Sequence, residues 1–187
     1  LAGLISLTYL DLYYNQISDI SVVANLTNLT SLDLFSNQIS DISAVAGLIN
    51  LWYLELGLNQ ISDISAVAGL TSLTNLYLYY NQISNINVVM GLTSLTYLYL
   101  NDNQIGNITP LVANLGIGSG DEVYLRNNPL GPLAFSNSIP TLEGRGVYVD
   151  YSIPPVNDVC FNAIPMALGE SYSGSNGGAT GIDLTSC

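Results

Sequence analysis

Carboxylates and tyrosines recur along the chain at a spacing of 22 residues. Asp11, Asp33 and Glu55 follow one another at this interval, and Tyr77 and Tyr99 continue the same series. A row of carboxylates can bind a cation or a basic partner, whereas tyrosine offers a stiff contact surface with a hydroxyl group at its tip. The spacing therefore indicates a repeated element that brings these side chains onto one surface.

The overall composition narrows the possible chemistry. The 187-residue chain has no histidine, only two cations (Arg126 and Arg145) and a formal net charge of -12. Because histidine is the usual general base and metal ligand, we expect no enzyme. Two cations cannot neutralise a phosphate backbone, so we expect no binding of nucleic acid. No apolar run approaches the ~18 residues of a membrane span, so we expect no membrane insertion.

The period belongs to five full units, which start at Leu7, Leu29, Leu51, Leu73 and Leu95. Each unit reads L-x-x-L-x-L-x-x-N-x-I-x-x-I, the pattern of leucine-rich repeats. Leucines two apart face one side of a short strand, and the later apolar residues at three-residue spacing suit 3-10 turns. Stacked units bury these residues in one shared core. The sequence therefore predicts an α/β-type solenoid, a right-handed leucine-rich-repeat coil with a parallel β-sheet on its concave face and 3-10 or turn segments on its convex face.

Two columns of short polar residues follow the predicted strands. Asparagine amides at the first can bond the backbone of their own and neighbouring turns, which predicts a structural ladder. The ladder consists of Asn15, Asn37, Asn59, Asn81 and Asn103. The second column has the turn-forming character of Asx residues, so we expect it to be structural as well. It consists of Asp19, Asp41, Asp63, Asn85 and Asn107.

The repeated segment "NQISDI" resembles the internalin-like class of bacterial leucine-rich-repeat proteins, whose units also have 22 residues. The resemblance continues in "GSGDEVYLRNNPL", which is similar to a last, shortened unit, and in "SIPTLEGRGVYVDY", which is similar to a helix-and-strand cap. It implies repeats over residues 1–130, with the shortened unit at 117–130, and a C-terminal cap over 131–151. Because "LAGLISL" matches the end of a unit, we expect the chain to begin within a repeat of a longer precursor.

Most of the tyrosines fall at the variable positions of the units. The third, fifth, seventh and eighth positions are predicted to face outward from the concave sheet. The tyrosines there either recognise a ligand, or reflect strand propensity and packing across strands. For the first case the sequence predicts these ligand-binding residues: Tyr9, Asp11, Tyr13, Asp33, Phe35, Tyr53, Glu55, Tyr77, Tyr79, Tyr97 and Tyr99.

Three explanations stay open for the acidic row Asp11, Asp33 and Glu55. The row is a solvated stripe, a subsite for Ca²⁺ or a basic partner, or a pair of glycosidase carboxylates. A glycosidase needs one carboxyl group with a raised pKa, and we expect an open concave surface to offer no desolvated pocket for it. Ca²⁺ is thus the one cofactor that the sequence leaves open.

The Pro/Gly/Ser-rich tail over residues 152–187 is similar to the start of a secreted β-sandwich module. Its Cys160 and Cys187 predict a disulfide, and with it an extracellular or cell-surface protein. The family resemblance implies adhesion through a protein or glycan ligand. The alternative is a structural subunit of an extracellular filament or matrix, which self-assembles head to tail through an uncapped N-terminal edge and the tail.

Overall fold

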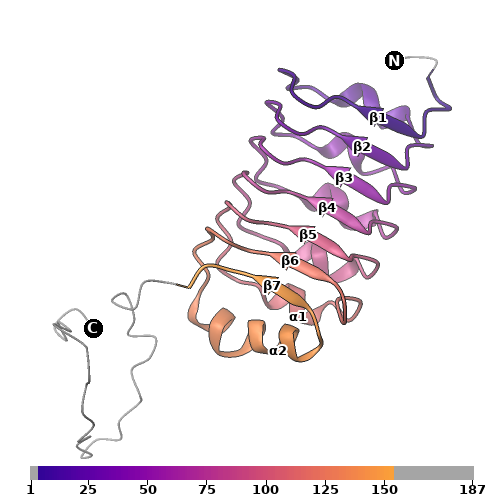
Figure 1. Ribbon diagram of the computed structural model, residues 1–187. Helices are drawn as coiled ribbons and strands as arrows, with labels where there is room; N and C mark the ends of the chain where they lie inside the picture. Colours follow the sequence, from indigo (N-terminus) through magenta and orange to yellow (C-terminus); the bar gives the residue numbers. More distant parts are fainter. Residues whose placement is uncertain (1–3, 154–187) are drawn as a thin grey trace, which may run out of the picture. The chain divides into compact units, whose positions relative to one another are not determined.

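The computed structural model describes residues 4–153, and its strands form one parallel sheet in chain order (Figure 1). Equivalent residues of successive units lie side by side, so that Leu10 pairs with Leu32 and Leu32 with Leu54. This arrangement confirms the predicted solenoid. Each strand has three residues: β1 (Tyr9–Asp11), β2 (Ser31–Asp33), β3 (Tyr53–Glu55), β4 (Asn75–Tyr77), β5 (Tyr97–Tyr99), β6 (Glu122–Tyr124) and β7 (Tyr148–Asp150).

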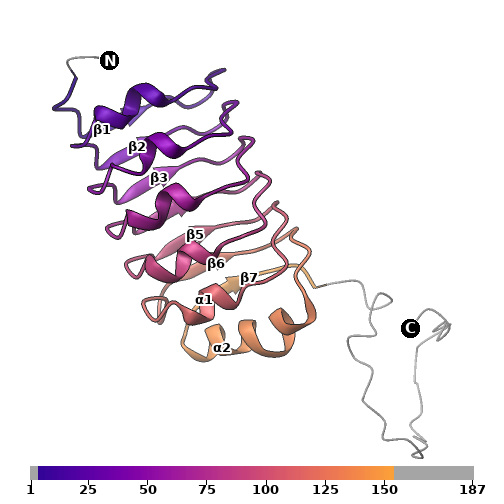
Figure 2. The same cartoon turned by 180° about the vertical axis from the view of Figure 1, so that it is seen from behind.

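Short helical turns form the layer opposite the sheet (Figure 2). The fifth unit differs from the others, because its turn is the α-helix α1 (Thr109–Ala113) with a proline in the first turn. Proline has a backbone φ close to the helical value and needs no N–H partner at that place. The other units confirm the predicted 3-10 segments, which span Ser21–Asn25, Ser43–Val45, Ser65–Gly69 and Asn87–Gly91.

The core is a continuous apolar column between the two layers. In the second unit Leu32 and Leu34 enter it from the strand side, and Ile39, Ile42 and Val45 enter it from the turn side. All five side chains are at most 2% exposed. Burying a side chain of this size stabilises the fold by roughly 1.5–3 kcal/mol. Because the same positions are filled in the next unit, each coil covers the core of its neighbour.

The predicted asparagine ladder joins consecutive coils. The Asn59 side-chain amide donates to the Leu56 carbonyl of its own coil at 3.1 Å and to the Leu34 carbonyl of the preceding coil at 3.0 Å. Its Oδ1 atom accepts the Ile39 backbone N–H at 3.0 Å. Asn15, in the first coil, donates only to carbonyls of its own turn. The full arrangement recurs at Asn37, Asn81, Asn103 and Asn128.

The second polar column shapes the turn that precedes each helical segment, as predicted. The Oδ1 atom of Asp19 accepts the Ser21 backbone N–H at 2.8 Å, which holds the pKa of Asp19 below its ordinary value. The same bond to the residue two positions later recurs at Asp41, Asp63, Asn85 and Asn107.

The last coil is covered by a helical turn at Ala134–Ser138, by the helix α2 (Ile139–Gly144) and by β7. Arg145, directly after α2, donates to the Val112 carbonyl at 2.7 Å and to the Asn114 carbonyl at 3.2 Å. These bonds tie α2 to the residues that end α1, and they engage one of the two cations in the chain.

Within residues 4–153, no helix has the length and apolar character needed to cross a membrane. The predicted disulfide between Cys160 and Cys187 lies outside the described residues, and so does nearly all of the tail.

Replacing one ladder residue should destabilise the whole solenoid. In Asn81→Ala, the backbone N–H of Ile61 and the carbonyls of Leu56 and Leu78 lose their side-chain partner in a buried place. We expect the free energy of unfolding, measured in urea, to fall by about 2–4 kcal/mol. The exposed neighbour provides the control, since Gln82→Ala should change it by less than ~0.5 kcal/mol. Equal effects of the two substitutions would contradict the ladder.

Candidate functional site

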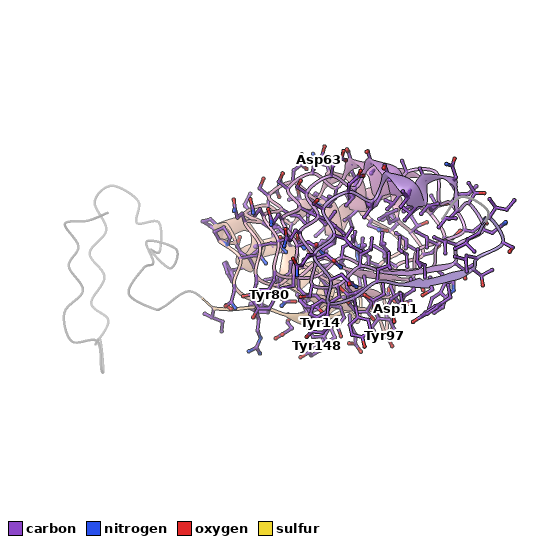
Figure 3. The ribbon with its side chains drawn as sticks, turned by 90° about the horizontal axis from the view of Figure 1, so that it is seen from above. Asp11, Tyr14, Asp63, Tyr80, Tyr97 and Tyr148 are labelled. Carbon is purple, nitrogen blue, oxygen red and sulfur yellow. The ribbon has the colours of Figure 1, made fainter. Side chains whose placement is uncertain are left out.

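The open sheet face, formed by the outward side chains of β1–β7 and of the residues that follow each strand, carries nearly all described tyrosines. Figure 3 shows Tyr14, Tyr80 and Tyr97 on this side and Asp63 on the opposite side. Among the tyrosines within residues 4–153, only Tyr151 lies elsewhere, against an aromatic ring of the cap. The open sheet face corresponds to the face predicted as concave.

A ladder of stacked rings runs along the middle of the open sheet face. The ring centroids of Tyr53 and Tyr77 are 5.4 Å apart, and those of Tyr77 and Tyr99 are 4.8 Å apart. Tyr99 and Tyr124 stack almost in parallel, at 4.1 Å and 16°. Tyr148 extends the ladder onto the cap, 5.8 Å from Tyr124. Packing across strands, the second explanation for the tyrosines, therefore accounts for the middle of the face.

Other tyrosines around this ladder project into solvent. Tyr9, Tyr14, Tyr80 and Tyr148 each keep more than half of their surface exposed. Tyr14 and Tyr80 occupy the eighth position of their units, where the backbone has a left-handed φ of 52° and 51°. Such a φ is unfavourable by roughly 1–2 kcal/mol for a residue other than glycine. The eighth position thus belongs to a turn, and strand propensity does not explain an aromatic side chain there, although the rings of Tyr14 and Tyr80 contact a neighbouring ring on the same face.

Gly57 leaves a gap in the column of seventh-position side chains, and Tyr79 fills it. The ring of Tyr79, which follows β4, reaches across β3 to Phe35, which follows β2, with 5.8 Å between the centroids. A Cβ atom at position 57 would lie 2.7 Å from the Tyr79 ring and 2.8 Å from Oε1 of Glu55. Contacts this short do not occur, so only glycine leaves room for both side chains.

Glu55 is buried beneath this arrangement, with 6% of its surface exposed. Its Oε1 atom accepts the Gly57 backbone N–H at 2.7 Å. Burial raises the pKa of Glu55 to about 7, and the nearby Asp33 adds to the increase, whereas the bonds from Gly57 and Tyr79 oppose it. The expectation that this face offers no desolvated place for a carboxyl group is therefore wrong, because Gly57 and Tyr79 together cover Glu55.

The other two acids of the row are more accessible. Asp11 is exposed and accepts a hydrogen bond from the Tyr9 hydroxyl at 3.2 Å. Asp33 is half-buried and accepts the Phe35 backbone N–H at 2.9 Å, and burial raises its pKa. The explanation of the row as a solvated stripe thus applies to Asp11 but not to Glu55. In the part of the chain that the structure describes, no group of three or more acidic, Cys or His side chains is arranged to hold a metal ion, and Ca²⁺ stays a prediction.

A cavity of about 470 Å³ opens on the open sheet face. Tyr77, Tyr99 and Tyr124 of the ring ladder line it, together with Glu55 of β3 and Asp150 of β7. Because Tyr99 and Tyr124 stack almost in parallel, their facing surfaces cover each other and their hydroxyl groups and ring edges are left to meet a ligand. The cavity therefore combines aromatic edges with carboxylates at β3 and β7.

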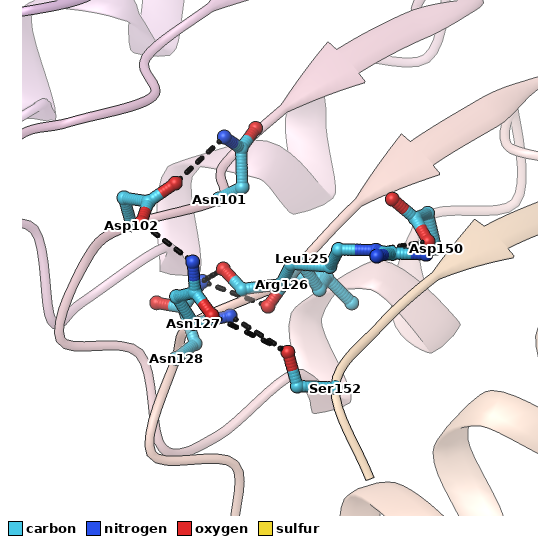
Figure 4. Close-up of polar contacts among 8 residues, drawn as sticks. All are labelled: Asn101, Asp102, Leu125, Arg126, Asn127, Asn128, Asp150 and Ser152. Atoms are coloured by element: carbon cyan, nitrogen blue, oxygen red, sulfur yellow. Dashed lines mark hydrogen bonds and ion pairs between the residues drawn. The ribbon is translucent and has the colours of Figure 1, made fainter.

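The side of the cavity near the cap holds a network of polar contacts (Figure 4). Arg126 pairs with Asp150, with 2.7 Å between Nε and Oδ1. Asp102 accepts hydrogen bonds from the side-chain amides of Asn127 at 2.7 Å and Asn101 at 3.0 Å. These contacts hold the side chains of Arg126, Asp150 and Asp102 in place, so this side of the cavity is ordered before any ligand arrives.

The structure brings four of the predicted ligand-binding residues together at the cavity: Glu55, Tyr77, Tyr79 and Tyr99. The remaining candidates lie along the same face outside the cavity: Tyr9, Asp11, Tyr13, Asp33, Phe35, Tyr53 and Tyr97.

Several cavity residues were not predicted from the sequence: Tyr80, Asn101, Asp102, Tyr124, Arg126, Asn127 and Asp150. Signals were present for Tyr80, Asn101 and Asp102, which occupy seventh and eighth positions predicted to face outward, and for Tyr124. Val123 and Leu125 enter the core like the strand leucines of a full unit, so Tyr124 between them had to face outward. Because β7 pairs in register with β6, Asp150 stands beside Tyr124 in the same column.

The comparisons with known proteins agree with this architecture. The family model described as leucine-rich repeats (2 copies) matches residues 5–50 and 71–113. The chain is a leucine-rich-repeat protein, and the open sheet face is the strand side of that fold.

Its repeats are internalin-like. Internalin C2 of Listeria monocytogenes is 35% identical, with a TM-score of 0.72 over 80% of this chain and 63% of that one. An internalin (inlF) of the same organism is 38% identical, with a TM-score of 0.72 over 82% and 44% of the two chains. A leucine-rich-repeat protein of Leptospira interrogans is 26% identical, with a TM-score of 0.70 over 79% and 38%. No curated protein matches the sequence.

These matches identify the chain as an internalin-like bacterial leucine-rich-repeat protein. It spans less than two thirds of the length of each of these three structures.

The burial of Glu55 should make stability depend on pH. Because its pKa is about 7 in the folded chain against an ordinary value of 4.5, the folded protein keeps a proton that the unfolded chain releases as the pH rises between these values. The free energy of unfolding therefore decreases over this window. The variant Glu55→Gln should not show this decrease. Its free energy of unfolding should be about 2–3 kcal/mol higher than that of the parent at pH 8, and equal to it near pH 4. Urea unfolding at both pH values measures the difference in free energy between the variant and the parent. A difference that does not depend on pH would contradict the prediction. The variant Glu143→Gln, at an exposed position, is the control.

Gly57→Ala should uncover Glu55. The added methyl group cannot coexist with the observed positions of the Tyr79 ring and of Oε1 of Glu55, so at least one must move. Water then reaches the carboxyl group, and its pKa should fall from about 7 toward 4.5. Carbon-13 NMR titration of the glutamate carboxyl groups reports this directly. An unchanged titration midpoint in a folded variant would show that Gly57 is not needed to bury Glu55.

Proposed function

We propose that this chain is an extracellular binding and adhesion module, not an enzyme, and that the open sheet face recognises a protein ligand. The observation that carries the proposal is the distribution of tyrosines: this face holds exposed tyrosines as well as a cavity lined by tyrosines, and none of the described tyrosines lies on the helical turns of the repeats. Tyrosine adds much contact area with little loss of side-chain entropy, so recognition surfaces use it.

The ordered rings beneath the exposed ones support the same function. A ladder of half-buried tyrosines, each in contact with the next, holds the surface in one conformation. A preorganised surface loses little conformational freedom when a partner binds, and affinity increases accordingly. Location outside the cell is proposed from the internalin-like repeats and from the two cysteines of the tail. Glycan binding and head-to-tail assembly stay predictions.

The proposal can be tested with two exposed tyrosines of the open sheet face, Tyr97 and Tyr148. The full chain is first screened on an array of purified ectodomains and on a glycan array. We then expect the double variant Tyr97→Ala with Tyr148→Ala to bind the captured protein at least tenfold more weakly. Aromatic side chains that become buried on binding dominate interface energies. The matched variant on the helical side, Val22→Ala with Met90→Ala, should bind like the parent. If the two double variants bind equally well, the open sheet face is not the binding site.

A further inference from the structure

We propose that the cavity on the open sheet face takes a lysine or arginine side chain of the protein partner, with Glu55 as its anchoring carboxylate. This inference rests on the proposed function and names the chemistry of its central contact. It is argued from the burial of Glu55, the charges that face it and the presentation of the surrounding rings.

Glu55 is a buried acid that has no cationic partner within residues 4–153. Buried carboxylates are ordinarily paired with a cation or a metal. The chain has only two cations: Arg126 pairs with Asp150, and Arg145 donates to backbone carbonyls near the cap. The hydrogen bonds to Glu55 come from the backbone N–H groups of Gly57 and Leu56 and from the Tyr79 hydroxyl, all of them neutral donors, and Glu55 lines the cavity. A cation supplied by a partner would complete the pairing that the chain itself does not provide.

The groups that face Glu55 from each side are acidic or aromatic. Asp33 approaches it from β2, Tyr53 shares its own strand, and Tyr77 and Tyr79 face it from the β4 side. Burial and the acids hold the pKa of all three tyrosines above 10, so their hydroxyl groups stay protonated at neutral pH. Phenol oxygens can accept hydrogen bonds from an ammonium or guanidinium group, and the rings attract its charge.

The charge balance of the whole face points to the same partner. The acids on the open sheet face include Asp11, Asp33, Glu55 and Asp102, whereas Arg126 is the one cation there and is already paired. A face with this excess of negative charge attracts basic surfaces and repels acidic ones.

A neutral sugar fits the cavity less well. Sugar rings bind proteins by stacking on an uncovered aromatic face, but the facing surfaces of Tyr99 and Tyr124 cover each other at 4.1 Å and 16°. The residues that line the cavity supply phenol hydroxyl groups and carboxylates, and these suit a small charged group that donates several hydrogen bonds. The geometry therefore favours a basic side chain over a glycan.

The test uses hexapeptide pools that differ only in the charge of one central residue. One pair of pools carries arginine or its neutral isostere citrulline, and the other carries lysine or acetyl-lysine. We expect the full chain to bind the charged pool at least tenfold more tightly than its isostere at pH 8, measured by fluorescence polarisation. The preference should shrink as the pH falls to 6, because protonated Glu55 no longer attracts a cation.

Glu55→Gln should abolish the preference, and a melting curve verifies that this variant is folded. Glu143→Gln makes the same chemical change at an exposed position of helix α2 and should keep the preference. Equal binding of charged and neutral pools by the parent, or an unchanged preference in Glu55→Gln, overturns the inference.

The outcome is separable from that of the proposed function. If Tyr97→Ala with Tyr148→Ala releases the array ligand but the parent shows no charge preference, the open sheet face binds a partner and the cavity does not select a cation. Binding of a neutral chitohexaose probe at the face, without any charge preference, likewise overturns the inference. A third result is also possible: the charge preference depends on Glu55, but the array ligand binds the double tyrosine variant as tightly as the parent. This result would support the cation site and refute the larger interface.

Discussion

Register between neighbouring coils is the constraint on which the rest of the structure depends. The apolar column and the asparagine ladder hold each residue beside the residues that occupy the same position in the units before and after it. An amide such as that of Asn59 bonds the backbone of two coils at once, so a shift of one residue would break bonds in both. The surface is therefore composed of columns, and a ligand meets the same position of several units at the same time.

This constraint explains why the fold and the binding face could be predicted from the sequence. Strand positions, the turn layer and the alignment of tyrosines all follow from one repeated pattern, because every unit buries equivalent residues. The strands end sooner than expected, since only the third to fifth positions form strand and the eighth adopts a left-handed turn at residues such as Tyr14 and Tyr80. The helix α1 also departs from the pattern, where a proline replaces the alanine or valine of the other units.

The environment of Glu55 could not be predicted from any single column. Its burial depends on a glycine two residues later in its own unit and on a tyrosine from the next unit that leans into the space so created. Each of the three residues taken alone looks ordinary for its position. Asp11 shows the contrast, because it occupies the same column as Glu55 yet stays exposed, with Tyr13 rather than a glycine two residues later.

The two explanations for the tyrosines apply to different residues and depend on each other. Rings such as Tyr77 and Tyr99 pack on their neighbours and would be present in a sheet that binds nothing, whereas Tyr80 and Tyr148 contact a neighbouring ring but keep more than half of their surface exposed. The packed rings nevertheless keep the surface rigid and exclude water around Glu55, which strengthens any charge interaction made there. A carboxyl group held in this place lowers the stability of the free protein at neutral pH. A site that is completed by its partner would show such a loss of stability in the free protein, confined to one residue of the binding face.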